Sequence, residues 1–370
     1  MTKIKRRCVV AELFVLILIL GGAYVLFWPV PIDPDGWNPP IAPPYEGRFA
    51  HRNKMSSAEK LWKGKIEGPE ATAIKDGYIY TGLANGDIVR MHIESEGEPE
   101  VLANTGGRPL GLKFDASGNI IICDADKGLL CVAPSGELSV LSDSVNGRQY
   151  KVADDLAIAA DGKIYFSDIS SKWTLAQADY AIMEDNALGE LICYDPATKT
   201  SSVALDGMHL SNGVAMGPDD EYVLINQTLG FCVTRLWLKG PKAGQSEPFV
   251  ENLPGGPDNI TFNGKDTYWV ALAFPRFPRL ETLAPKPFLK KLMLRLPKFL
   301  APVPEFFDGL NVPGYGLFVG VDMDGNVTHF IDAHDGAFGM VTSVLEHEGQ
   351  LYIGEIAGEY IGRMPIPDPV

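Results

Sequence analysis

Short apolar segments alternate with turns over most of the chain. From residue 67 onward these segments are rich in aromatic and β-branched residues, and many turns carry pairs such as Asp76-Gly77 and Asp161-Gly162. Such pairs favour tight hairpins because a primed turn requires positive φ. The strand-turn-strand pattern recurs in six copies of about fifty residues, which is the scale of a four-stranded propeller blade. We therefore predict an all-β fold, a six-bladed β-propeller over residues 60–370.

The first sixty residues follow a different pattern. A basic flank, 1–8, precedes an apolar run, 9–28, that only Glu12 interrupts and that is long enough to cross a bilayer as one transmembrane helix. The positive flank predicts a single-pass protein whose propeller lies on the non-cytoplasmic side, in a periplasm, in a lumen or outside the cell. A cleaved signal peptide is the alternative, although no clear cleavage site follows. The proline-rich segment 29–59 is expected to be an extended linker rather than packed structure.

The fifth copy is interrupted by an insertion, 275–315. Within it, 288–299 intersperses leucines with lysines and arginines at helical spacing, between Pro287 and an expected end or kink at Pro297. This basic segment stands out because the whole chain carries a formal net charge of −15. Two interpretations stay open: a lid over one face of the propeller, or an amphipathic helix that lies on anionic lipid headgroups.

Composition narrows the classes of function. The negative charge opposes contact with phosphate backbones, so no nucleic-acid partner is expected. The five cysteines form no CxxC pair and no zinc-like cluster. Cys123 and Cys131 lie on neighbouring predicted strands, and both a disulfide and unpaired burial stay open. The six histidines form no nucleophile–base motif, and no G-x-S-x-G is present.

Polar residues precede the apolar first strand of four copies. They are Glu67, Asp154, Asn212 and Asp258, and Asn259 follows the last of them. The first strands of a propeller surround its axis, so side chains at equivalent positions converge there. Carboxylate and amide oxygens suit a hard cation, and Ca²⁺ takes about six to eight of them. Each residue alone could be a turn cap, but their common position favours a metal site.

Several phrases in the sequence resemble the strictosidine synthase-like family. They are Arg108-Pro-Leu-Gly-Leu112, Ala153-Asp-Asp-Leu156, Tyr165-Phe-Ser-Asp168, Leu210-Ser-Asn-Gly-Val214, Gly256-Pro-Asp-Asn-Ile260 and Glu346-His-Glu-Gly-Gln-Leu-Tyr-Ile-Gly354. They occur in order between residue 60 and the C-terminus, and the apolar run before them resembles the adipocyte plasma membrane-associated members. The resemblance implies a six-bladed, calcium-dependent propeller related to paraoxonases and gluconolactonases.

The resemblance also implies which residues surround the metal, taken as Ca²⁺ or another divalent cation. These are Glu67, Asp154, Asn212 and Asp258, with Asn259 beside them. Glu70 is the weaker of two neighbouring candidates, because the Glu-Gly-Pro phrase aligns Glu67 with the ligand of the superfamily. Asp154 stands where paraoxonases more usually have Asn, which adds a negative charge.

The resemblance to the family does not by itself determine which reaction the protein catalyses. Thr342 stands where strictosidine synthases carry a glutamate, so a Pictet–Spengler condensation is not expected. Leu110 and Phe274 stand where paraoxonases carry histidines, and with Asp155 and Thr342 they are the substrate-pocket candidates. We predict metal-centred hydrolysis of an ester or lactone, of arylesterase or lactonase type, with Asp258 as general base or nucleophile. The alternative is a non-catalytic, membrane-tethered propeller that binds a ligand and holds a structural calcium.

Overall fold

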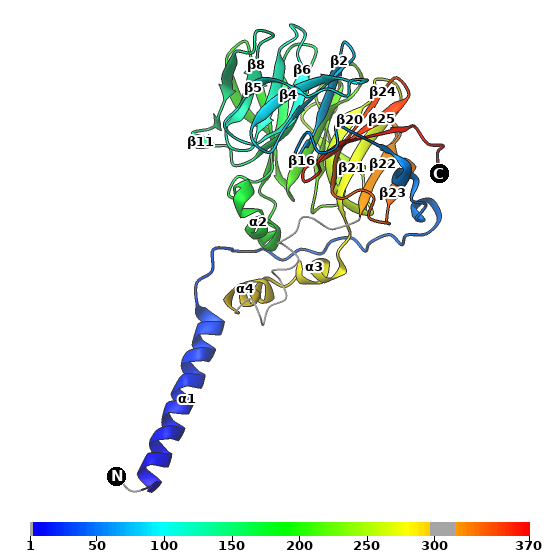
Figure 1. The fold of residues 1–370 in the computed structure, drawn as a ribbon. Helices are drawn as coiled ribbons and strands as arrows, with labels where there is room; N and C mark the ends of the chain where they lie inside the picture. The colour runs from blue at the N-terminus through cyan, green and yellow to red at the C-terminus, as the bar shows by residue number, and fades with distance from the viewer. Residues whose placement is uncertain (1–2, 297–314) are drawn as a thin grey trace.

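The computed structural model describes residues 3–296 and 315–370 and shows a six-bladed β-propeller (Figure 1). Each blade is an antiparallel sheet of four strands. Blade 1 contains β2 (Thr72–Lys75), β3 (Tyr78–Gly82), β4 (Asp87–His92) and β5 (Glu100–Asn104). Blade 2 contains β6 (Pro109–Phe114), β7 (Ile120–Asp124), β8 (Gly128–Val132) and β9 (Leu138–Ser142). Blade 3 contains β12 (Ala153–Ile158), β13 (Ile164–Asp168), β14 (Gly189–Asp195) and β15 (Thr200–Met208).

The other blades continue in chain order. Blade 4 contains β16 (Ser211–Met216), β17 (Tyr222–Gln227), β18 (Cys232–Trp237) and β19 (Ser246–Val250). Blade 5 contains β20 (Gly255–Phe262), β21 (Tyr268–Pro275), β22 (Gly316–Val321) and β23 (Val327–Ala333). Blade 6 contains β24 (Val341–His347), β25 (Gln350–Glu355), β26 (Ile361–Pro365) and β1 (Glu59–Leu61). A small hairpin of β10 (Ser144–Val145) and β11 (Arg148–Gln149) precedes blade 3.

The first strand of the propeller closes the ring. β1 pairs antiparallel with β26, and Glu59 lies opposite Arg363. The guanidinium of Arg363 donates to the Glu59 carboxylate from Nε at 3.0 Å and from Nη2 at 2.7 Å. The two ends of the propeller are therefore held in one sheet. Blade 6 thus takes its outer strand from the start of the domain, far in sequence from its other three strands.

The predicted turns have the expected backbone. Asp76 and Gly77 have φ of 53° and 78°, as a primed two-residue hairpin turn requires. The strand that follows this turn, β3, is rich in aromatic and β-branched residues and is buried over nearly its whole length.

Cys123 and Cys131 lie on neighbouring strands, as predicted. Cys123 lies opposite Leu129 and Cys131 lies opposite Ile121, and both cysteines are free thiols.

The N-terminal helix stands apart from the blades. α1 (Lys3–Phe27) projects from one face of the propeller (Figure 1), and its Val10–Phe27 window has a mean hydropathy of 2.5 with none of it buried. A helix of this length and composition is able to cross a bilayer. The fold thus combines a propeller with one apolar helix that fits a membrane anchor.

The proline-rich linker, 29–59, packs on the propeller and is not a free spacer. Ile32 and Met55 are fully buried, and Tyr45 Oη donates to the Pro254 carbonyl at 2.8 Å. The segment is extended, as predicted, apart from short 3₁₀ turns. The expectation that it avoids packing is wrong, because apolar side chains between the prolines find buried positions on the blades. As a result, the linker holds the end of α1 close to one face of the propeller.

Three helices lie on the face nearest to α1 (Figure 1). α2 (Ala178–Glu184) belongs to blade 3, between β13 and β14, whereas α3 (Pro278–Leu283) and α4 (Pro287–Arg295) begin the predicted insertion, 275–315. The expected amphipathic helix over 288–299 is present as α4 up to Arg295. The remainder of the insertion, 297–314, lies outside the described residues, as do residues 1–2 of the expected basic flank.

Candidate metal centre

The inner strands bring the candidate ligands together at one end of the propeller axis. β2, β6, β12, β16, β20 and β24 are the innermost strands, and each contacts the inner strand of the next blade. Five of them have a register irregularity near their first residues, for example between Ala153 and Leu156 and between Ser211 and Val214. Such an irregularity leaves residues unpaired and redirects their side chains. It places Asp154, Asn212 and the residues after Pro257 at the axis.

Three carboxylates form the centre of this site. Ligand oxygens of Glu70, Asp154 and Asp258 all lie within 4.8 Å of one another, and all three residues are buried. Asn259 Nδ2 donates to Glu70 Oε1 at 2.5 Å, which fixes one glutamate oxygen. Thr342 Oγ1 donates to the main-chain carbonyl of Glu70 at 2.8 Å. The cluster therefore comes from separate blades, and its neighbours leave two of its carboxylate oxygens without a hydrogen-bond donor.

The unused atoms are all acceptors. Among the candidate ligands, four buried oxygens have no hydrogen-bond donor from the described residues: Glu70 Oε2, Asp154 Oδ1, Asn212 Oδ1 and Asn259 Oδ1. Leaving a buried acceptor unsatisfied costs about 1–3 kcal/mol, so four at one place call for a common partner. Carboxylate and amide oxygens without nitrogen or sulfur match the preference of Ca²⁺ or another hard divalent cation. These residues thus fit such an ion.

Burial and mutual repulsion shift the acidity of the cluster. Burial first, and then the charges of Asp154 and Asp258, raise the pKa of Glu70 well above its usual value. Burial and the neighbouring Asp155 raise the pKa of Asp154 to about 8, and burial and Asp154 raise that of Asp258 strongly. The nearby Arg108 guanidinium counteracts the rise for Glu70 and Asp154. Without a cation, the site therefore retains protons that a bound cation would displace.

Glu67 does not belong to the cluster, and the preference for it over Glu70 is wrong. Its side chain is exposed, and its carbonyl accepts the Ala84 N–H at 3.0 Å. Gly68 then turns the chain inward with φ of 65°, and a Cβ there would lie 2.8 Å from the Ile356 carbonyl oxygen. Only after this turn does the chain reach the axis, at Glu70. The sequence did offer one signal for Glu70, namely its position two residues before the inner strand β2.

An apolar cavity of about 110 Å³ lies over the carboxylates. Glu70, Asp154, Asn212 and Asp258 line it together with many apolar side chains. Leu110 and Phe274 line it as well, as expected of pocket residues. The other two pocket candidates do not: Asp155 Oδ2 accepts the Val214 N–H at 3.0 Å, and Thr342 holds the Glu70 carbonyl.

A lid that the sequence did not reveal forms the outer wall of the cavity. It consists of residues 169–188, which contain α2, and it contributes Trp173, Leu175 and Ile182 to the lining. The sequence pattern did not reveal this helix, because a short helix within an otherwise all-β repeat has too few residues to show clear periodicity. The lid makes the cavity apolar and shelters the carboxylates from water.

The lid is fixed at its C-terminal end by two buried acids. The Glu184 carboxylate accepts hydrogen bonds from Lys172 Nζ at 2.6 Å, from the Asp33 N–H at 2.9 Å and from Trp173 Nε1. Asp185 Oδ2 accepts from Trp37 Nε1 at 2.5 Å. Since Asp33 and Trp37 belong to the linker, these bonds join the lid to the segment that follows α1.

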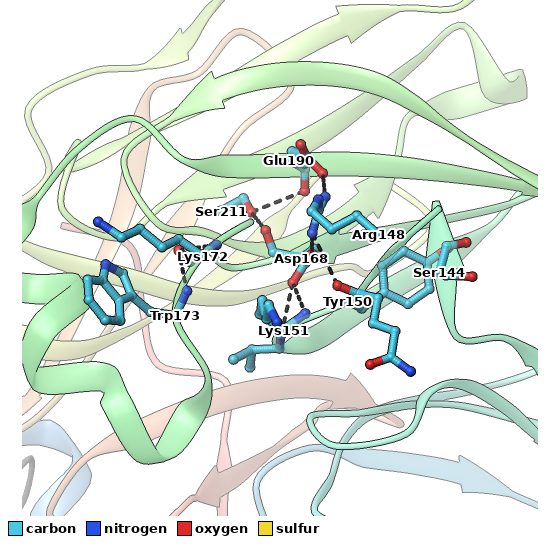
Figure 2. Close-up of polar contacts among 12 residues, drawn as sticks. Ser144, Arg148, Tyr150, Lys151, Asp168, Lys172, Trp173, Glu190 and Ser211 are labelled. Atoms are coloured by element: carbon cyan, nitrogen blue, oxygen red, sulfur yellow. Dashed lines mark hydrogen bonds and ion pairs between the residues drawn. The ribbon is translucent and has the colours of Figure 1, made fainter. Parts of the chain in front are cut away.

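The base of the lid is fixed by a second network (Figure 2). Figure 2 shows Arg148, Asp168, Glu190 and Ser211 pointing toward one another at the end of β13. Asp168 Oδ2 accepts from Arg148 Nη1 at 2.9 Å, and Ser211 Oγ donates to the Asp168 carbonyl at 2.7 Å. Ser211 directly precedes Asn212. The network therefore links the start of the lid to the strand that carries one candidate ligand.

Close packing of the inner strands gives a test of this geometry. A Cβ atom at Gly213 would overlap the Asp258 carbonyl oxygen and lie 2.6 Å from the Asn259 Cα. Gly213→Ala is therefore expected to destabilise the fold by about 2 kcal/mol and to weaken cation binding. Gly339→Ala is the control, because its Cβ would meet only Glu355 Oε2, at 3.8 Å. Thermal unfolding with and without Ca²⁺ measures both effects, and equal behaviour of the two variants would contradict the packing argument.

Comparison with known proteins places this geometry in a family. A family model described as strictosidine synthase matches residues 154–241, and one described as strictosidine synthase-like, N-terminal, matches residues 47–91. Adipocyte plasma membrane-associated protein from Rattus norvegicus is 33% identical over 359 residues, covering 91% of this chain and 93% of the relative. Protein strictosidine synthase-like 6 from Arabidopsis thaliana is 32% identical over 318 residues, covering 84% of this chain and 82% of the relative.

Solved structures share the fold at low identity. A gluconolactonase from Xanthomonas campestris matches with a TM-score of 0.59 and 16% identity, covering 91% of this chain and 98% of the other. The calcium-binding protein regucalcin from Agrobacterium tumefaciens matches with a TM-score of 0.57 and 12% identity, covering 84% and 94%. These likenesses show the propeller alone. The rat relative is similar across nearly the whole of both chains, and the chain therefore belongs to the strictosidine synthase-like family.

Proposed function

We propose that this protein is a membrane-anchored, divalent-cation-dependent hydrolase of esters or lactones. The observation that carries the proposal is a group of unsatisfied acceptor oxygens, of which those of Glu70, Asp154 and Asn212 belong to residues that line an apolar cavity. An apolar cavity with a few converging polar groups of perturbed pKa is a common form of an active site. Gluconolactonase and regucalcin structures of the same fold are consistent with this chemistry and with calcium.

Five residues of the chain offer oxygen ligands for the cation. The residues that would hold it are Glu70, Asp154, Asn212, Asp258 and Asn259. When bound, a divalent cation acts as a Lewis acid toward a carbonyl oxygen and stabilises the oxyanion that forms on hydrolysis. The family resemblance first pointed to Ca²⁺, and the all-oxygen ligand set supports it, although another hard divalent cation would satisfy the same atoms.

Asp258 is the residue we propose as general base. It lines the cavity, and the side chain of Asn212 donates a hydrogen bond to its carboxylate. This contact orients the carboxylate toward a reacting water, from which a carboxylate oxygen would take the proton. Burial and Asp154 raise the pKa of Asp258 in the metal-free site, and a bound cation would displace that proton and leave the carboxylate free to accept one from water. The apolar walls hold the rest of the substrate and exclude bulk water.

We further propose a single-pass topology with the propeller on the non-cytoplasmic side. α1 is long and apolar enough to span a bilayer, and the sequence places Lys3, Lys5, Arg6 and Arg7 at its start. Such a positive flank favours retention on the cytoplasmic side. The relatives named for association with the adipocyte plasma membrane agree with a membrane location.

Asp258→Asn tests the reaction. In the full chain in detergent, we expect it to lower kcat/KM for a panel of esters and lactones by roughly 10²–10⁴-fold, because the amide does not accept the proton. A chelator should abolish the parent activity, and added Ca²⁺ should restore it. Asp126→Asn is the control, since Asp126 is exposed on a turn of blade 2.

Two outcomes would overturn this function. Activity that survives both the chelator and Asp258→Asn would place hydrolysis outside this site. A chain that binds Ca²⁺ and gains stability from it, but turns over no ester or lactone, would instead be the non-catalytic membrane-tethered propeller with a structural calcium.

A further inference from the structure

Helix α4 has the reverse of the usual surface pattern. Two of its three cations, Lys290 and Arg295, are only 1% and 9% exposed, and the third, Lys291, pairs with Asp33. Phe288 and Leu289, by contrast, are 54% and 37% exposed. A water-facing helix normally exposes its charges and buries its apolar side chains. Phe288 and Leu289, here called the apolar patch, therefore call for an apolar partner outside the propeller.

The buried cations are used to hold α4 in place. Lys290 Nζ lies 3.8 Å from Asp185 Oδ2 and donates to the Glu184 carbonyl at 3.3 Å. Arg295 Nε donates to the Trp28 carbonyl at 2.6 Å, at the end of the apolar run of α1. The sequence-based idea that the basic residues of this helix rest on anionic headgroups does not fit these two residues, because both point into the protein. The contacts instead fasten α4 between the lid and the end of α1.

Helix α4, which carries the apolar patch, adjoins the end of the anchor. α1 and α4 are in contact, and in Figure 1 α4 lies between the propeller and the end of α1. The side chains of α1 from Val10 to Phe27 are largely exposed and apolar, so a bilayer is their natural surrounding. A short helix that adjoins the end of such a span lies near the membrane interface, where exposed Phe and Leu side chains partition favourably.

The same helix is joined to the cavity by apolar packing. Met293 and Leu294 of α4 pack against a buried cluster that includes the cavity-lining residues Trp173, Ile182 and Phe274. Ile32 of the linker belongs to this cluster as well. An apolar layer therefore extends from the membrane side of α4 to the outer wall of the cavity.

We propose that the apolar patch of α4 rests in the membrane interface and that the site takes its substrate from the bilayer. The substrate class is then an amphiphilic ester or lactone with a long acyl chain. Hydrolysis breaks the acyl C–O bond, adds the water hydroxyl to the acyl carbon, and leaves the second water proton on the released alcohol. This inference rests on the proposed hydrolase function and the proposed anchor, and it adds the source and the polarity of the substrate.

Photo-cross-linking tests the membrane contact without any turnover. The full chain, reconstituted in phosphatidylcholine nanodiscs, carries p-benzoyl-phenylalanine in place of Phe288. We expect cross-links from position 288 to lipid. The same group in place of Val140, which is 60% exposed on β9 of blade 2, should give none. Equal lipid labelling at both positions, or cross-links from position 288 to a second copy of the chain instead of lipid, would overturn the proposal.

Kinetics test the substrate class. The double variant Phe288→Asp, Leu289→Asp should lower kcat/KM for a long-chain ester dissolved in the bilayer by about tenfold or more, since two apolar groups leave the interface. Its kcat/KM for a short, water-soluble aryl acetate should not change. An equal loss for both substrates would overturn the proposed entry from the bilayer. If no ester is hydrolysed by any variant, the hydrolase function and the substrate class fail together, while the cross-links still decide the membrane contact.

Discussion

Glu70→Gln is expected to lower the affinity of the chain for Ca²⁺ by roughly 10²-fold and the ester or lactone activity at limiting Ca²⁺ to a similar degree. The substitution keeps the size of the side chain and an oxygen near Asn259, but it removes one of three negative charges that lie within 4.8 Å of one another. The Oε2 atom without a donor among the described residues is the one most available to a cation. Competition with a fluorescent chelator, on the full chain in detergent, gives the affinity.

Glu67→Gln provides a matched control for this experiment. It makes the same chemical change three residues earlier, at an exposed side chain outside the cluster. We expect Ca²⁺ affinity, activity and thermal stability close to those of the parent. If Glu67→Gln weakens binding and Glu70→Gln does not, the cation lies elsewhere and the assignment of the centre is wrong.

The fold was predictable because it is repetitive. Each blade carries the same strand and turn chemistry, so six weak signals of one period support a single architecture. The sequence pattern did not show which segment supplies the fourth strand of the last blade. β1 has only three residues, Glu59–Leu61, and so short a strand has no recognisable alternation of its own.

The sequence predicted a cluster of oxygen ligands at the propeller axis, but it did not identify every residue of that cluster. Asp154, Asn212 and Asp258 all stand at the same point of their inner strands, and the structure brings them to the axis. Glu67 and Glu70 both lie shortly before the inner strand β2. Which of the two is the candidate ligand depends on where the turn at Gly68 ends. At that turn Gly68 lies so close to Ile356 that an added Cβ would be 2.8 Å from its carbonyl oxygen, and no local pattern reveals this long-range proximity.

The face over the site depends still more on long-range contacts. Glu184 and Asp185 look like ordinary surface acids in the sequence, and they are buried only because the linker, Lys172 and Lys290 surround them. Likewise, the spacing of charges in α4 predicts a helix but not which side of it faces the protein. Its orientation is decided by ion pairs and hydrogen bonds to residues more than a hundred positions away.

The stability of the metal-free chain is expected to fall as the pH rises from about 5 to 8. In this window the unfolded chain has ionised carboxylates, whereas the folded site retains protons because burial and mutual repulsion raise the pKa of Asp154 to about 8 and raise those of Glu70 and Asp258. The folded state then binds more protons than the unfolded state, so the free energy of unfolding decreases with pH. Between pH 5 and 8 the raised pKa of Asp154 alone corresponds to a loss on the order of 3 kcal/mol.

Calcium should reverse this trend. A bound cation favours the ionised carboxylates, so stability at pH 8 should rise with Ca²⁺ concentration by mass action, and Ca²⁺ affinity should fall as the pH is lowered. Thermal unfolding of the full chain in detergent, in chelator and in excess Ca²⁺ from pH 5 to 8, measures both effects. Asp154→Asn removes one of the crowded charges and should flatten the decline in chelator. A metal-free chain whose stability is constant or increases between pH 5 and 8 would show that these carboxylates are not crowded and buried together in solution, and the candidate metal centre would then lose its physical basis.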